Sequence, residues 1–191
     1  MRREFSTQTL VLIPVAIAIN IAVGQLAVAT KVPLYLDSIG TVLVGVLAGP
    51  WAGALTGFLA NVIWTVTGLY PPAIAFAGVA AIIGALAGAL GRSGWMKVWW
   101  RAALAGVLTG LVAAVLSAPI AAYVFGGVMG SGTDAIVALA RSVGLTSLGA
   151  NMAQGAFSDP LDKAVSFLVV WALLRALPKG FLSRFPSGDS A

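Results

Sequence analysis

Two apolar runs of unequal length meet at a glycine-proline turn. The first run, residues 38–49, has twelve residues, and a helix of that length rises only about 18 Å against a hydrocarbon core of roughly 30 Å. The second run follows directly after Gly49-Pro50-Trp51-Ala52-Gly53. A helix too short to cross a membrane must be tilted, extended by its flanks or shielded by protein, and such helices often border a cavity. We therefore expect a short helical hairpin inside a membrane protein.

The chain as a whole is strongly apolar. It is 60% hydrophobic and 9% charged, with a mean hydropathy of +1.00, which excludes an ordinary soluble domain. Six spans are predicted, at about residues 8–29, 35–48, 50–66, 72–90, 100–125 and 160–177. Residues 126–154 are less apolar and rich in glycine, with a short surface helix predicted over 134–143 and capped by Thr133. We expect one all-α integral membrane domain of six transmembrane helices over residues 1–185, and a polar tail over 186–191.

The first span has the outline of a signal peptide, with a basic start and the small residues Ala27-Val28-Ala29 at its end. Its apolar run of about twenty residues exceeds the usual signal-peptide core, so a retained helix is favoured over cleavage. Small residues also recur four apart in several spans, which lets helices approach closely. In the first helix, small residues flank the polar Asn20, and this face suits either internal packing or a second membrane protein.

Basic residues are distributed unequally between the loops. With six spans both termini share one side, which holds eight of the eleven lysines and arginines. These eight are Arg2, Arg3, Arg92, Lys97, Arg101, Arg175, Lys179 and Arg184. The opposite loops hold only Lys31 and Arg141. Cytoplasmic loops retain positive charge, so we expect cytoplasmic N and C termini, a cytoplasmic Gly49-Pro50 turn, and outer loops around Asp37 and Tyr70.

Polar residues gather at the outer ends of the spans. Asp37 precedes the second span. It is either a ligand contact or the N-cap of the helix, a position that Ser38 could occupy instead. Asn61 and Trp64 are three apart and so share one helical face, although Trp64 also suits an interfacial anchor. Tyr70 lies in a proline-stiffened loop, as a lid over a ligand or as part of a plain turn.

The sixth span begins with Ser158-Asp159-Pro160-Leu161-Asp162-Lys163. Asp159 as N-cap and Pro160 at the first helical position form a good helix start. An ammonium inside a membrane must be paired, so Lys163 is expected to bind either Asp159, four residues earlier, or an anion. Asn151, Gln154 and Tyr123 would complete a pocket. The candidate substrate-binding residues are Asp37, Asn61, Trp64, Tyr70, Tyr123, Asn151, Gln154, Asp159 and Lys163.

Several function classes are disfavoured. The chain has no cysteine and no histidine, so thiolate nucleophiles, histidine bases and Cys/His metal sites are absent. Ser166 near Lys163 lacks an oxyanion-hole motif, and the glycine-rich residues 126–132 lack the Gly-Lys-Ser/Thr ending of a nucleotide loop. The basic residues sit at segment ends rather than in a patch, so nucleic acid is not an expected partner. We expect no catalytic residue, no metal and no cofactor bound by this chain.

The order of these features resembles the substrate-binding S component of an energy-coupling factor (ECF) vitamin transporter. The resemblance rests on an alanine pair four apart in the first helix (Ala18 and Ala22), on the Gly49 to Gly53 motif, and on the starts of the second and sixth spans, Leu36 to Thr41 and Ser158 to Phe167. It covers nearly the whole chain. None of these motifs is specific alone, but their order is.

The resemblance implies a multi-pass protein of a bacterial or archaeal cytoplasmic membrane that captures a vitamin or precursor from outside. It implies docking through Ala18 and Ala22 onto a membrane coupling protein driven by a pair of ABC ATPases, with delivery by toppling. ATP would bind those partners. The aromatic residues suit a heterocycle such as thiamine or its pyrimidine precursor, whereas Lys163 suits a carboxylate such as pantothenate, biotin or folate. A ligand-sensing or accessory membrane domain and a stand-alone transporter are the alternatives.

Overall fold

The computed structural model describes residues 4–188, and every regular element within that range is helical. The elements in chain order are α1 (Thr7–Thr30), α2 (Ile39–Ala48), α3 (Pro50–Val66), η1 (Pro71–Phe76), α4 (Ala77–Arg92), η2 (Trp95–Lys97), α5 (Trp99–Val124), α6 (Asp134–Ser142), α7 (Ser147–Ala176) and α8 (Lys179–Leu182). The predicted all-α class is confirmed. Three segments, α1, η1 with α4, and α5, are long and apolar enough to cross a membrane, which is compatible with a membrane protein.

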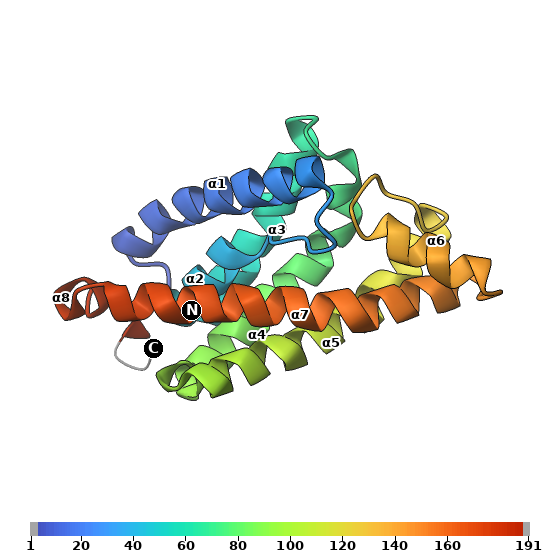
Figure 1. Ribbon diagram of the computed structural model, residues 1–191. Coiled ribbons are helices and arrows are strands. Elements are labelled where there is room, and N and C mark those ends of the chain that lie inside the picture. Colours follow the sequence, from blue (N-terminus) through green and yellow to red (C-terminus); the bar gives the residue numbers. More distant parts are fainter. Residues whose placement is uncertain (1–3, 189–191) are drawn as a thin grey trace.

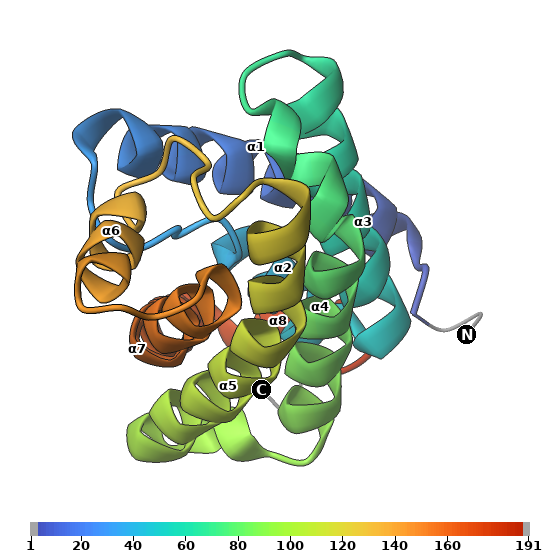
Figure 2. The same ribbon diagram turned by 90° about the vertical axis from the view of Figure 1, so that its right-hand side faces the viewer.

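The predicted hairpin consists of α2 and α3, joined at Gly49, whose φ of 122° lies in a region that favours glycine. All ten residues of α2 are buried. Of the three ways to accommodate so short an apolar helix, the protein therefore uses shielding. α1, α3, α4 and α7 pack around it, as the two views in Figure 1 and Figure 2 show.

Small residues bring the helices together where the sequence predicted. A side chain at Gly84 of α4 would collide with the backbone of Gly53 in α3, and one at Gly110 of α5 with the backbone of Asp159 in α7. Asn20 of α1 donates to Thr41 at 2.8 Å and accepts from the Gly40 amide at 2.7 Å. The polar side chain in the first helix thus finds its partners within the chain.

Two predicted boundaries are wrong. The second helix begins at Ile39 rather than residue 35, because residues 32–38 form an irregular loop. The last long helix begins at Ser147 rather than Pro160: Thr146 is its N-cap and accepts from the Gly149 amide at 3.1 Å. Pro160 consequently lies inside α7. The short helix α6 follows Thr133 as predicted, but the Thr133 side chain makes no capping bond.

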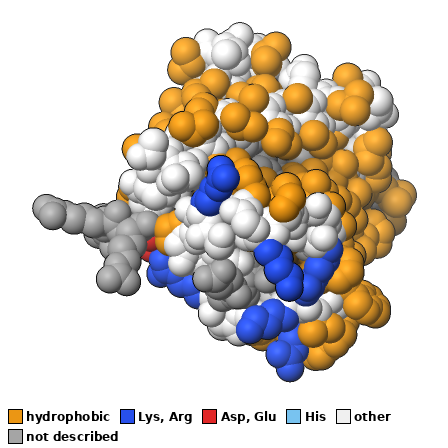
Figure 3. Space-filling view, turned by 90° about the vertical axis from the view of Figure 1, so that its left-hand side faces the viewer, with side chains coloured by type: hydrophobic (Ala, Val, Ile, Leu, Met, Phe, Trp, Pro, Cys, Tyr) orange, Lys and Arg blue, Asp and Glu red, His pale blue; other side chains and the backbone are white. Residues whose placement is uncertain are grey.

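Both ends of the described chain meet the Gly49 turn at one end of the molecule (Figure 1). Glu4 pairs with Arg92 at 2.6 Å and accepts from the amide of Trp51 at 2.8 Å, in the first turn of α3. The Ser187 amide donates to the Leu47 carbonyl at 2.8 Å, so the start of the predicted tail packs on α2, while residues 189–191 lie outside the described range. Figure 3 shows lysine and arginine side chains gathered over this end.

Candidate functional site

A cavity lies at the opposite end of the molecule, between α2, α3, α4, α5 and α7. The space between its walls is about 820 Å³ when the open solvent at its mouth is included. Eight of the nine candidate residues line it. They are Asp37, Asn61, Trp64, Tyr70, Asn151, Gln154, Asp159 and Lys163.

Tyr123 is the candidate that the structure leaves outside this cavity. Its side chain is 75% exposed on α5. The α5 residues that line the cavity include Ala118 and Ala121, and two further residues along a helix turn by about 200°. Tyr123 therefore points away from the cavity although it lies at the predicted end of the helix.

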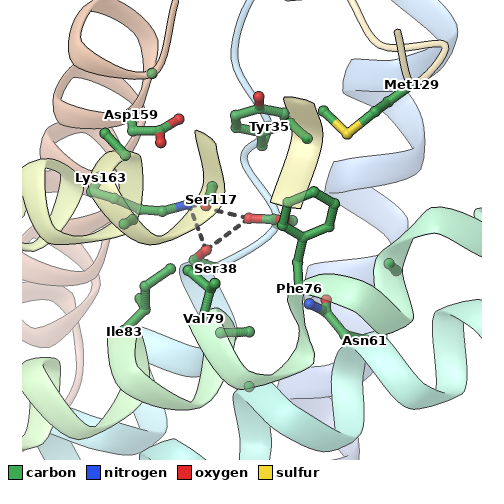
Figure 4. Close-up of a pocket in the computed structure, with 18 of the residues that line it drawn as sticks. Tyr35, Ser38, Asn61, Phe76, Val79, Ile83, Ser117, Met129, Asp159 and Lys163 are labelled. Carbon is green, nitrogen blue, oxygen red and sulfur yellow. Dashed lines mark hydrogen bonds and ion pairs between the residues drawn. The ribbon is translucent and has the colours of Figure 1, made fainter. Parts of the chain in front are cut away.

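Lys163 is paired, but not with Asp159 as its spacing suggested. Its ammonium donates to Ser38 Oγ at 2.8 Å, to Asp37 Oδ1 at 3.2 Å and to Asp162 Oδ2 at 2.5 Å. Figure 4 shows it converging with Ser38 on the floor of the cavity. A lysine ammonium has three N–H donors, so these three acceptors use all of them. The partners of Lys163 come from the loop before α2 and from α7 itself.

Asp162 also holds that loop in place. Its Oδ1 accepts from the backbone amides of Tyr35 at 2.9 Å and Leu36 at 2.7 Å. Leu36 has a φ of 53°, which is unfavourable for a residue with a side chain. Ser38, not Asp37, occupies the N-cap position of α2, and no side chain caps the helix there. Asp37 is thus a partner of Lys163 rather than the predicted N-cap.

Three loops close over the cavity, formed by residues 31–38, 67–70 and 125–133. The Tyr70 hydroxyl donates to the Met129 carbonyl at 3.2 Å, and Lys31 donates to the Gly130 carbonyl at 2.7 Å. The Asp134 carboxylate accepts from the amides of Met129 and Gly130. Burial, together with the nearby carboxylates of Asp134 and Asp37, raises the pKa of Tyr70 to about 12, so the phenol stays protonated as a donor. Tyr70 therefore joins two of the loops above the cavity.

Aromatic side chains form much of the wall. Trp64 is only 4% exposed, its indole N–H donates to Gln25 at 3.2 Å, and its ring centroid lies 5.2 Å from that of Tyr70. An interfacial anchor would be exposed to lipid headgroups, so that alternative for Trp64 is wrong. Phe76 and Tyr35 lie on other sides of the same space (Figure 4).

Several buried polar groups of the cavity lack partners. The Asn151 amide nitrogen donates to the Ser147 carbonyl at 2.8 Å, which leaves its oxygen unpaired, and the Gln154 amide nitrogen is unpaired as well. Asp159 is 4% exposed, and none of the hydrogen bonds among residues 4–188 involves its carboxylate. Its predicted N-cap role is wrong because α7 begins twelve residues earlier. Buried polar groups are normally satisfied, so these three side chains indicate a missing partner.

Other lining residues were not predicted, among them Tyr35, Ser38, Phe76 and Met129. Tyr35 and Ser38 flank Asp37, so the outer position of that loop could have suggested them. Met129 and Phe76 carry no polar signal, because apolar residues are common throughout this chain. Only the packing of the loops brings them to the cavity.

No family model, curated protein or solved structure matches this chain. The chemistry of the cavity and its place in the molecule are therefore the features that indicate a function.

Proposed function

We propose that the protein is the substrate-binding S component of an ECF-type ABC transporter, which captures a water-soluble vitamin or precursor from outside the cell. The observation that carries the proposal is the cavity. It is lined by residues of five helices, has aromatic rings in its wall, and contains buried polar groups without partners. Few buried groups are left unpaired unless a ligand, water or ion satisfies them.

The distribution of charge supports an outward-facing cavity. In the proposal the six spans are α1, α2, α3, α4 with η1, α5 and α7. Six of the described lysines and arginines belong to the loops and helix ends on the side of the termini: Arg92, Lys97, Arg101, Arg175, Lys179 and Arg184. Lys31 and Arg141 belong to the loops beside the cavity. By the positive-inside rule the termini are cytoplasmic and the cavity opens outward, in the cytoplasmic membrane of a bacterium or archaeon.

The exposed face of α1 supports docking onto a coupling protein. Ala18 and Ala22 are exposed, whereas Ala16, Asn20 and Gly24 are buried against the chain's own helices. Internal packing thus uses one face of α1 and leaves the alanine pair free. Small residues four apart allow close helix contact within a membrane. A membrane coupling protein driven by two ABC ATPases would contact this face. ATP would bind to those ATPases and not to this chain.

Copurification tests the proposal. The tagged full chain, purified from its host's membranes in mild detergent, should bring down a membrane coupling protein and two ABC ATPases, identified by mass spectrometry. Substituting both Ala18→Trp and Ala22→Trp should remove these partners because the indoles block close helix contact. Ala156→Trp, an equally large change at an exposed position of α7, should retain them.

Two results would contradict the proposal. Equal recovery of the ATPases with the double variant would remove α1 as the docking face. If the wild-type chain binds a small molecule but brings down no ATPase, the protein is instead a ligand-sensing or accessory domain, or a stand-alone transporter.

A further inference from the structure

The polar floor of the cavity is not built to receive an anion. Lys163 is the only lysine or arginine among the described residues that line the cavity. Its ammonium is 4% exposed and already has three acceptors, two of them carboxylates. A ligand carboxylate would have to displace Asp37 or Ser38 and leave that group unsatisfied, which is costly in a buried site.

The same floor has an excess of negative charge. Asp37 and Asp159 contribute two carboxylates to the lining, Asp162 contributes a third that contacts Lys163 without lining the cavity, and Lys163 contributes one ammonium. With all four side chains ionised, their formal charge is −2. Lys163 contacts two of the carboxylates directly. Asp159 receives no hydrogen bond from residues 4–188, and Figure 4 shows its carboxylate directed toward Tyr35, away from the dashed bonds of Lys163.

A carboxylate in such a place is ionised only beside a counter-charge and otherwise takes up a proton. Burial of an ionised group is strongly unfavourable unless it is paired and hydrogen-bonded. Towards the N-terminus of the same helix, the unpaired oxygen of Asn151 offers a second acceptor, and the amide nitrogen of Gln154 offers one donor. The aromatic rings of Trp64 and Tyr70 provide surfaces that attract both flat apolar groups and cations.

On this basis, and resting on the proposed function, we propose that the substrate is a cation with a flat ring. Its positively charged N–H group faces the Asp159 carboxylate, a further N–H faces Asn151, and an acceptor on the ligand faces Gln154. Lys163 is then a positioning residue, which holds Asp37, Ser38 and Asp162 in place and does not contact a substrate carboxylate. The ligand class is therefore a protonated amine, amidine or charged heterocycle, and not a carboxylic acid.

Matched probes of opposite charge test the inference. Binding to the purified full chain would be measured by isothermal titration calorimetry with benzamidine and benzoate, which share a flat ring and differ in charge, and with thiamine and pantothenate as larger probes. We expect the cationic member of each pair to bind at least about tenfold more tightly than the anionic one, as for complementary charges in a desolvated site.

Variants of Asp159 identify the contact. Asp159→Asn should weaken binding of the cationic probes about 100-fold, because an amide keeps the shape but removes the charge. Asp159→Glu should recover part of the affinity. Tyr123→Ala, at the same end of the molecule but outside the cavity, should bind like the wild type.

The inference is overturned if neither cationic probe binds, if an anionic probe binds more tightly than its cationic counterpart, or if Asp159→Asn leaves the affinity unchanged. Its failure is separable from failure of the proposed function. Asp159-dependent cation binding without copurifying ATPases would leave the inference standing and overturn the transporter. Copurifying ATPases together with preference for a carboxylate would do the reverse.

Discussion

Two carboxylates three residues apart on α7 have different tasks. Asp162 is fully buried and accepts hydrogen bonds from Lys163 and from the backbone of Tyr35 and Leu36. Asp159, less than one helical turn earlier, has no such partner within the described chain. Asp159 is therefore available to a ligand, whereas Asp162 maintains the loop over the cavity.

This difference predicts opposite effects on stability. Asp162→Asn removes the charge that pairs with a buried ammonium, and breaking such a pair typically costs about 3–5 kcal/mol. Asp159→Asn removes a buried charge without a partner, so the ligand-free protein should keep its stability or gain some. Thermal unfolding of both variants in the same detergent measures the difference. A midpoint for Asp162→Asn equal to that of Asp159→Asn would contradict the assignment.

At this scale the sequence predicted which polar residues line the cavity better than it predicted their partners. Polar residues are scarce in so apolar a chain, so the few at the outer ends could be identified without the fold, and eight of nine line the cavity. The partner of Lys163 could not be identified, because Asp37 lies 126 positions away and Asp159 satisfied a local spacing rule. Tyr123 lies outside the cavity. Its placement was not predicted because the sequence indicates how far along a helix a residue lies more reliably than which way its side chain points.

Among the elements, α7 differs most from its prediction. Asp159-Pro160 has the composition of a helix start, but proline is tolerated inside a membrane helix where neighbouring groups satisfy the freed carbonyl. Gly110 of α5 packs against the backbone at this point. Because α7 begins thirteen residues before Pro160, Asn151 and Gln154 lie on the same helix as Asp159 and Lys163. A single rigid element thus carries four of the polar residues of the cavity.

Glycines at the crossing of α3 and α4 determine how closely these helices pack. A methyl group at Gly84 would meet the backbone of Gly53, whereas one at Gly78, also in α4, would meet open space. Gly84→Ala should therefore destabilise the protein by about 1–3 kcal/mol through overpacking, which lowers the unfolding midpoint by about 2–4 °C per kcal/mol for a chain of this size. The matched variant Gly78→Ala should leave it unchanged or raise it slightly, because alanine favours helix. Similar midpoints for both variants would show that the crossing is looser than described.

Across the whole molecule, the cavity and most of the described basic residues lie at opposite ends. One end carries the termini, the Gly49 turn and most of the basic residues, held together by Glu4 and Arg92. The other end carries the cavity and the three loops above it. The short hairpin connects them, since α2 begins beside Asp37 and ends at the Gly49 turn. A buried α2 can maintain this separation because lipid need not contact it.

The division predicts which loops face each side of the membrane. The chain contains no cysteine, so single-cysteine variants report on one position only. Ser142→Cys, exposed at the end of α6, should react with a membrane-impermeant maleimide in intact cells. Ser93→Cys, exposed after α4, should react only after permeabilisation, because the basic loops are retained in the cytoplasm. Wild-type protein should not react in either state. The reverse pattern would place the cavity on the cytoplasmic side and exclude capture from outside, whatever the cavity binds.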